Sequence, residues 1–71
     1  MFGDNVRILR KQRGWSQAEL ARRLNRSPST VTMIEQNERL PSLPLALDIA
    51  RILETTTEAL AHTAQPEQVQ S

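Results

Sequence analysis

The stretch WSQAELARRLNRSPSTVTMIEQN, residues 15–37, decides the fold, because it encodes two short helices with almost nothing between them. Ser16 and Glu19 match an S-x-x-E capping box, so the first of these helices is expected to begin at Gln17. It is expected to end at Asn25, because Asn tolerates a positive φ better than other non-glycine residues. The chain then restarts a helix within three residues, which is the spacing of a helix-turn-helix unit.

The second helix of the stretch is expected over residues 28–36, with Ser27 as its cap and Pro28 in its first turn. Val31 and Ile34 point to one side of it. The opposite side lacks the Lys and Glu of an ordinary exposed helix; it carries Pro28, Ser29, Thr32, Met33 and Gln36. Hydroxyl groups hydrogen-bond base edges, and apolar groups contact thymine methyls. We interpret this side as a DNA-reading surface; the alternative is a neutral surface helix.

The residues before this stretch encode one further helix. Asp4 is expected to cap it, and Gly14 supplies the left-handed stop that follows a helix ending near Arg13. No strand pattern appears anywhere in the chain. The predicted fold class is therefore all-α.

The residues after the stretch encode two more helices. Ser42 is expected to cap a helix over residues 43–53, and Thr56 or Thr57 a short fifth one. The longer of the two is apolar over more than half of its circumference, whereas a surface helix needs a stripe of about 100°. We expect it to be the central helix or to be covered by another subunit. The residues predicted for that subunit contact are Leu45, Ile52 and Leu60.

Composition limits the function. The chain has 71 residues, no Cys and one His, which leaves few groups for metal or nucleophilic chemistry, so we expect neither an enzyme nor a bound metal or cofactor. No apolar run approaches the roughly 20 residues needed to span a membrane, and the absence of Cys fits the cytoplasm. Residues 1–61 are expected to form one domain, and residues 62–71 a flexible polar tail.

Charge is distributed unevenly along the chain. Residues 1–39 hold eight Arg and Lys against four acidic residues, a net charge of +4, whereas residues 40–71 hold one Arg against four acids, a net charge of −3. A positive end of this kind favours binding to a polyanion such as DNA. Charge alone is equally compatible with a solvated, mixed-charge surface.

Three segments, VRILRKQRGWSQAELARRL, SPSTVTMIEQNERLPSL and ALDIARIL, resemble the phage-repressor/Cro-like (XRE family) helix-turn-helix domains over about residues 4–60. The resemblance implies a compact five-helix bundle of the lambda-repressor-like type, with the helix-turn-helix at the second and third helices. It also implies a homodimeric regulator that sets its third helix in the major groove of a two-fold operator.

The resemblance also implies roles for individual residues. The residues expected to face bases are Pro28, Ser29, Thr32 and Met33. Those expected to contact DNA phosphates are Arg10, Gln17, Arg26, Ser27, Gln36 and Arg39. Arg10 and Glu35 occupy the positions of an ion pair between the first and third helices, so a structural role for Arg10 is an open alternative.

The sequence is compatible with two functions. The first is a sequence-specific regulator of transcription that binds double-stranded DNA as a homodimer, with repression as its expected effect. The second is a protein-interaction module, or an antitoxin- or controller-type protein, that binds a partner protein through its last two helices. The sequence does not choose among phage or plasmid repressors, restriction–modification controllers and antitoxins.

Overall fold

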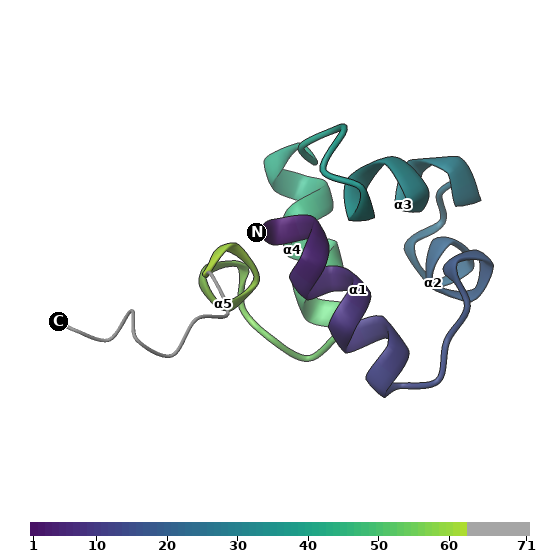
Figure 1. The fold of residues 1–71 in the computed structure, drawn as a ribbon, viewed down its shortest axis with the longest axis horizontal. Helices are drawn as coiled ribbons and strands as arrows, with labels where there is room; N and C mark the ends of the chain where they lie inside the picture. Colours follow the sequence, from purple (N-terminus) through teal and green to yellow (C-terminus); the bar gives the residue numbers. More distant parts are fainter. Residues whose placement is uncertain (63–71) are drawn as a thin grey trace, which may run out of the picture.

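The computed structural model describes residues 1–62, which form five helices and no strand (Figure 1). The helices are α1 (Phe2–Gln12), α2 (Gln17–Leu24), α3 (Pro28–Glu35), α4 (Leu43–Ile52) and α5 (Thr57–Ala61). The predicted all-α fold of five helices is confirmed. The predicted tail lies outside the described residues, except for His62.

Side-chain caps begin three of the helices where the sequence predicted them. The hydroxyl of Ser16 accepts a hydrogen bond from the Glu19 amide at 3.0 Å, and that of Ser42 accepts one from the Leu45 amide at 3.4 Å. Thr56, rather than Thr57, caps α5 by accepting from the Ala59 amide at 3.0 Å. Each cap satisfies one of the backbone N–H groups that a helix leaves without a partner at its start.

Left-handed residues separate the helices. Gly14, Asn25 and Asn37 have φ values of 74°, 59° and 61°, a conformation that Gly and Asn adopt more readily than other residues. Glu54 has a φ of 57° although it is not glycine or asparagine. Arg13 lies against this turn, because its Nη2 donates to the Leu53 carbonyl and to Glu54 Oε1, each at 3.1 Å. Arg13 thus joins the end of α1 to the turn that precedes α5.

The predicted start of the first helix was wrong. The helix begins at Phe2 after Met1, and Asp4 lies inside its first turn. The reason is a contact from far along the chain, since the Gly3 amide donates to Asn37 Oδ1 at 3.1 Å. A side chain at the end of α3 therefore takes up an N–H group at the start of α1.

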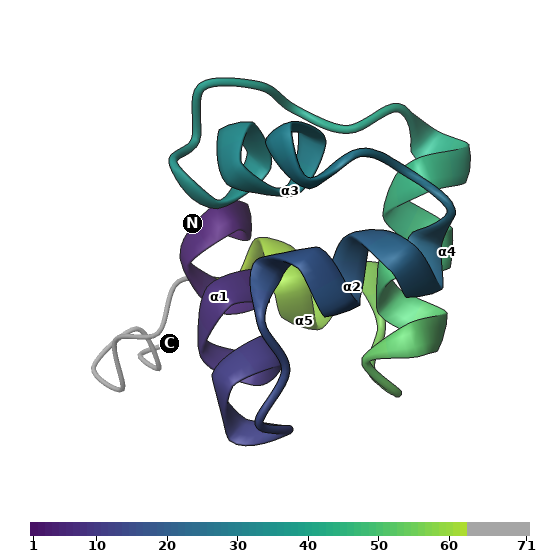
Figure 2. The same ribbon diagram turned by 90° about the vertical axis from the view of Figure 1, so that its right-hand side faces the viewer.

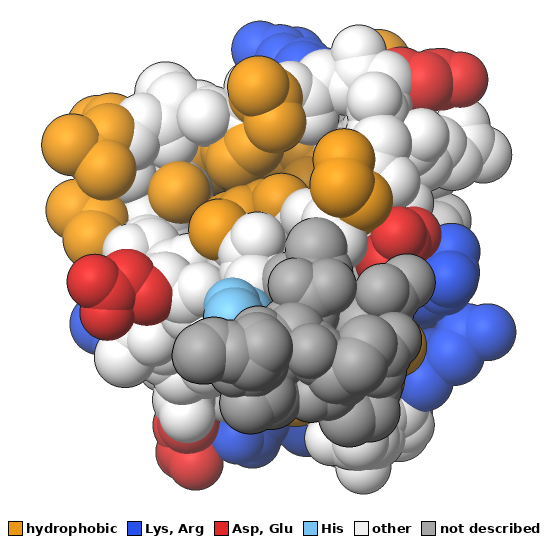
Figure 3. Space-filling model, turned by 60° about the vertical axis from the view of Figure 1, so that its left-hand side comes forward, with side chains coloured by type: hydrophobic (Ala, Val, Ile, Leu, Met, Phe, Trp, Pro, Cys, Tyr) orange, Lys and Arg blue, Asp and Glu red, His pale blue; other side chains and the backbone are white. Residues whose placement is uncertain are grey.

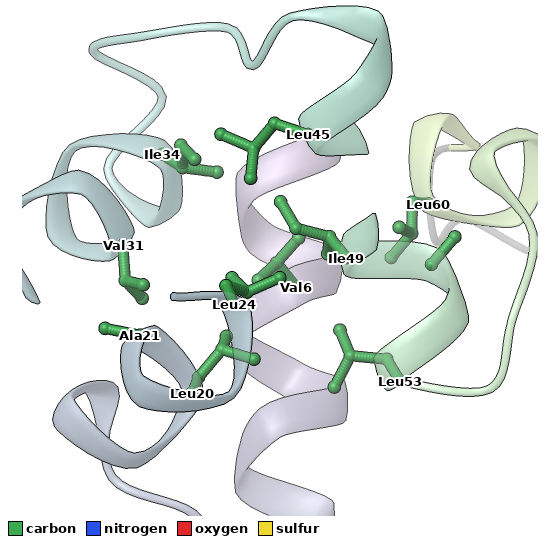
Figure 4. Packing of buried hydrophobic residues seen from close by; sticks show 11 residues of the cluster. Val6, Leu20, Ala21, Leu24, Val31, Ile34, Leu45, Ile49, Leu53 and Leu60 are labelled. Atoms are coloured by element: carbon green, nitrogen blue, oxygen red, sulfur yellow. The ribbon is translucent and has the colours of Figure 1, made fainter. Parts of the chain in front are cut away.

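The core lies where the five helices converge (Figure 4). Every helix contributes to it through apolar residues that are almost wholly buried, namely Val6, Leu20, Ala21, Leu24, Val31, Ile34, Leu45, Ile49, Ala50, Leu53 and Leu60. Figure 2 shows α3 above α1 and α2, so that the outer side of α3 belongs to one end of the molecule. Within residues 1–62, no helix is long and apolar enough to cross a bilayer.

We predict that Gly3→Ala destabilises the protein by about 1–3 kcal/mol, the usual cost of forcing extra volume into a packed site. A Cβ at Gly3 would stand 2.1 Å from the Ile34 carbonyl oxygen, so α1 and α3 must separate. Thermal unfolding measures the loss, and amide resonances of residues 34–37 are expected to shift.

Gly14→Ala is the matched comparison. Nothing lies within 4 Å of a Cβ at Gly14, so its cost arises only from the positive φ. The resonances of residues 34–37 should then stay in place. Equal shifts in both variants would contradict a specific contact of Gly3 with α3.

Candidate nucleic-acid interface

The two sides of α3 differ as the sequence predicted. Val31 and Ile34 are buried against the core. The other side is open to solvent: Pro28, Ser29 and Gln36 are exposed, and Thr32 and Met33 are half-buried. The four predicted base-reading residues therefore lie on a helix face that no other part of residues 1–62 covers completely.

The joint between α2 and α3 is short and hydrogen-bonded. Asn25 turns the chain in a left-handed conformation, and the Arg26 amide donates to the Ala21 carbonyl at 2.9 Å. Ser27 takes the N-cap position of α3, but its hydroxyl does not bond to the helix backbone. It lies 3.2 Å from the Ser29 hydroxyl and 3.1 Å from the Thr30 hydroxyl. These contacts leave the joint little freedom to change the angle of α3.

A buried ion pair ties α1 to α3. Arg10 Nε and Nη2 donate to the two carboxylate oxygens of Glu35 at 2.6 and 3.0 Å, which is a bidentate geometry. Arg10 is 7% and Glu35 2% exposed. Arg10 Nη1 donates to the Trp15 carbonyl at 2.8 Å, so each nitrogen of the guanidinium has a partner. The predicted phosphate contact of Arg10 does not fit this geometry, because the guanidinium is shielded from solvent and already engaged.

Gln17 extends this network to the outer side of α3. Its Nε2 donates to Glu35 Oε1 at 3.0 Å, and its Oε1 accepts from the Thr32 hydroxyl at 2.8 Å. The side chain predicted to contact a phosphate is thus hydrogen-bonded within the protein. No sequence pattern predicts this contact, because it depends on how α2 crosses α3.

The other predicted phosphate-binding residues flank α3. Arg26 and Ser27 precede it, Gln36 and Arg39 follow it, and all four are exposed. Within residues 1–62, no salt bridge involves Arg26 or Arg39. Positive charge is therefore available at both ends of α3.

The arginines of α2 have partners on their own helix. Arg22 and Arg23 both form salt bridges with Glu19, and Arg23 also lies 4.1 Å above the centre of the Trp15 ring. The hydrogen bond from Arg22 lowers the pKa of the Glu19 carboxyl, and the same hydrogen bond raises the pKa of Arg22. These contacts favour a structural role for the pair.

The predicted subunit contact requires correction. Leu45 is 5% and Leu60 0% exposed, so both belong to the core and offer no surface to a second chain; Ile52 is half-buried. The large exposed apolar residues on this side are Leu43 on α4, 68% exposed, Leu47 on α4, 52% exposed, and Leu40 in the preceding loop. Figure 3 shows apolar side chains gathered on the face where α4 and α5 lie.

The described residues offer no metal site. In residues 1–62, no three His, Asp or Glu side chains are grouped closely enough to hold an ion. Over the same range, each buried side-chain nitrogen or oxygen has a hydrogen-bond partner. The polar groups open to a ligand are therefore those on the surface, among them the hydroxyls of α3.

Comparisons with known proteins agree with this geometry. The family model described as Helix-turn-helix (HTH_3) matches residues 6–60. A relative from Bacillus subtilis (strain 168), the uncharacterized HTH-type transcriptional regulator YazB, is 34% identical over 61 residues, which are 86% of this chain and 88% of YazB.

Two solved structures have the same fold. A crystal structure of SinR, the master regulator for biofilm formation, in complex with DNA superposes with a TM-score of 0.80 at 27% identity, over 87% of this chain and 100% of that chain. A complex of SinR with SinI superposes with a TM-score of 0.81 at 26% identity, over 100% of this chain and 69% of that chain. The predicted lambda-repressor-like bundle is confirmed by this agreement.

We predict that Glu35→Gln destabilises the protein by about 3–5 kcal/mol, because it leaves the positive charge of Arg10 buried without a compensating negative charge. Such a loss is a large share of the roughly 5–15 kcal/mol that stabilises a typical domain. Chemical denaturation measures it. Glu38→Gln is the control, since Glu38 is exposed.

Replacing both charges, by Arg10→Met with Glu35→Leu, should recover part of the stability, because no uncompensated charge then remains. A double variant less stable than Glu35→Gln would contradict this account of the pair.

Proposed function

Since the chain belongs to the helix-turn-helix (HTH_3) family of DNA-binding transcriptional regulators, we propose that it recognises a two-fold operator in double-stranded DNA as a homodimer and represses transcription there. The family is not a class of enzymes. The observation that carries the proposal is the open face of α3, which a buried ion pair holds in place between exposed Arg26 and Arg39.

Four residues on that face are proposed to contact bases in the major groove, namely Pro28, Ser29, Thr32 and Met33. An α-helix fits this groove, and hydroxyls, methyl groups and a thioether meet base edges and thymine methyls there. The four residues lack the amide or guanidinium groups that form bidentate pairs with a base. Part of the specificity is therefore expected to come from DNA shape.

The phosphate contacts are proposed for Arg26, Ser27, Gln36 and Arg39. They bracket α3, so they would fix its position along the groove without reading sequence. Gln17 is proposed to act mainly through Thr32, because its side-chain amide is already bonded within the protein.

A homodimer is supported by the apolar surface of α4. Leu43 and Leu47 are one helical turn apart and exposed, with Ile52 half-buried on the same helix. A two-fold dimer would bury the same surface of each copy. It would also bring two copies of α3 to half-sites about one DNA turn, roughly 34 Å, apart.

Repression is the proposed effect, since a protein bound across an operator excludes other proteins from it. The similarity to YazB, called a transcriptional regulator, and to SinR, solved on DNA, supports a role in transcription. Because its proposed target is DNA, we propose a cytoplasmic location.

A second candidate function is binding of a partner protein through α4 and α5. The exposed Leu40, Leu43 and Leu47 favour it, because a partner could cover the same surface. SinR has been solved in complex with SinI, which supports the idea for this fold.

We predict salt-sensitive binding to a two-fold duplex site that Thr32→Glu combined with Met33→Glu abolishes, because two carboxylates then face the bases and phosphates. Fluorescence anisotropy over a salt series measures it. Gln12→Glu combined with Ala61→Glu is the control, with the same change of charge at exposed positions away from α3. Flat titrations of the unmodified protein with genomic and random duplexes at low salt would contradict the proposed function.

We predict that Leu43→Glu combined with Leu47→Glu shifts the protein toward a monomer, since charges would then be buried at the subunit contact. Sedimentation equilibrium measures the change. Ile8→Glu, at an exposed apolar residue of α1, is the control. If the unmodified protein is a monomer at high concentration, the homodimer proposal is wrong and the partner-protein function is favoured.

A further inference from the structure

A continuous chain of hydrogen bonds runs from the interior of the protein to its proposed DNA-reading face. Arg10 donates to Glu35 at 2.6 and 3.0 Å. Gln17 Nε2 donates to Glu35 at 3.0 Å, and the Thr32 hydroxyl donates to Gln17 Oε1 at 2.8 Å. Arg10 and Glu35 are buried, whereas Thr32 is half-buried on the outer side of α3. A buried charge is thus connected to a side chain proposed to contact a base.

The chemistry of the groups fixes the direction of each bond. A guanidinium only donates, and an ionised carboxylate only accepts. The amide of Gln17 must therefore turn its NH₂ group toward Glu35, which leaves its oxygen toward Thr32. That oxygen only accepts, so the Thr32 hydroxyl must supply the proton.

A hydroxyl has one proton and two lone pairs. The proton of Thr32 has a second acceptor on its own helix, the Pro28 carbonyl at 3.2 Å. Both acceptors lie within the protein. Toward a partner outside the protein, the hydroxyl oxygen of Thr32 can therefore only accept a hydrogen bond.

We propose that Gln17 is a positioning residue that makes Thr32 a hydrogen-bond acceptor toward DNA, so that the base nearest Thr32 is adenine or cytosine. This inference rests on the proposed function. In the major groove, adenine offers its N6 amino group and cytosine its N4 amino group, whereas guanine and thymine offer only acceptors at the corresponding edge. Guanine or thymine would place an acceptor against an acceptor.

The other residues of the reading face carry no such restriction. The hydroxyls of Ser29 and Ser27 lie 3.2 Å apart, and either of them is able to donate. Pro28 has no donor, and the thioether of Met33 is only a weak acceptor. Among the hydroxyl groups of the reading face, that of Thr32 is therefore the one whose role as donor or acceptor is determined by contacts inside the protein.

The experiment is a selection of bound sequences from random duplex DNA, carried out with the full chain and with the variant Thr32→Val. Valine keeps the shape of Thr32 and removes the hydroxyl. The position whose preference disappears in the variant is the one that Thr32 reads, and we expect adenine or cytosine there. Replacing that base by an analogue without the exocyclic amino group should weaken binding by roughly three- to tenfold, the range of one hydrogen bond, and should leave Thr32→Val unaffected.

The role of Gln17 is tested at the same position with Gln17→Leu. The hydroxyl of Thr32 then loses its nearer acceptor, and the preference for an amino-bearing base should fall several-fold. Gln17→Met, which keeps the length of the side chain, is measured as well, and thermal unfolding verifies that each variant is folded. Thr32→Ser should keep the base preference, and Gln12→Leu, at an exposed Gln of α1, should change nothing.

Three outcomes would overturn the inference while leaving the proposed function intact. They are a selected guanine or thymine at the position that depends on Thr32, the absence of any such position, and an unchanged preference in folded Gln17 variants. Failure of the proposed function looks different, because the unmodified chain would then select no duplex sequence, and the inference would fall with it.

Discussion

The bidentate pair between Arg10 and Glu35 is the interaction on which the rest of the structure depends. It joins α1 to α3, a helix that buries only two apolar residues of its own, Val31 and Ile34. Removing two charges from water is costly, and the cost is offset here because both charges find several partners. Arg10 also binds the Trp15 carbonyl, and Glu35 also binds Gln17.

The elements of the fold were largely predictable because their signals are local. A Ser or Thr at a helix start needs only the next three residues to act as a cap, as at Ser16, Ser42 and Thr56. A left-handed residue likewise needs only its own side chain to be small or able to bond locally. Asp4 shows the limit of this reasoning, because Asn37 reaches α1 from the end of α3 and changes where α1 begins.

The candidate site was predictable to a smaller extent, because its details depend on how helices cross. Helical periodicity gave the open face of α3 correctly, yet it was unable to reveal that Gln17 meets Thr32. The apolar residues of α4 cover more of its circumference than one core can bury. Periodicity does not predict which of these residues remain exposed. Leu45 went into the core and Leu47 stayed exposed, although both belong to this set.

One consequence follows from the position of Trp15, the only tryptophan of the chain. Its carbonyl binds Arg10, and its ring lies beneath the guanidinium of Arg23 at 4.1 Å. Trp15 therefore links the buried pair, through its carbonyl, to α2, through its ring. Because indole emission responds to nearby charge and to water, intrinsic fluorescence would report on the loosening of this link in the unlabelled protein. Fluorescence of Trp15 would thus follow the contact between α1 and α3 without an added label.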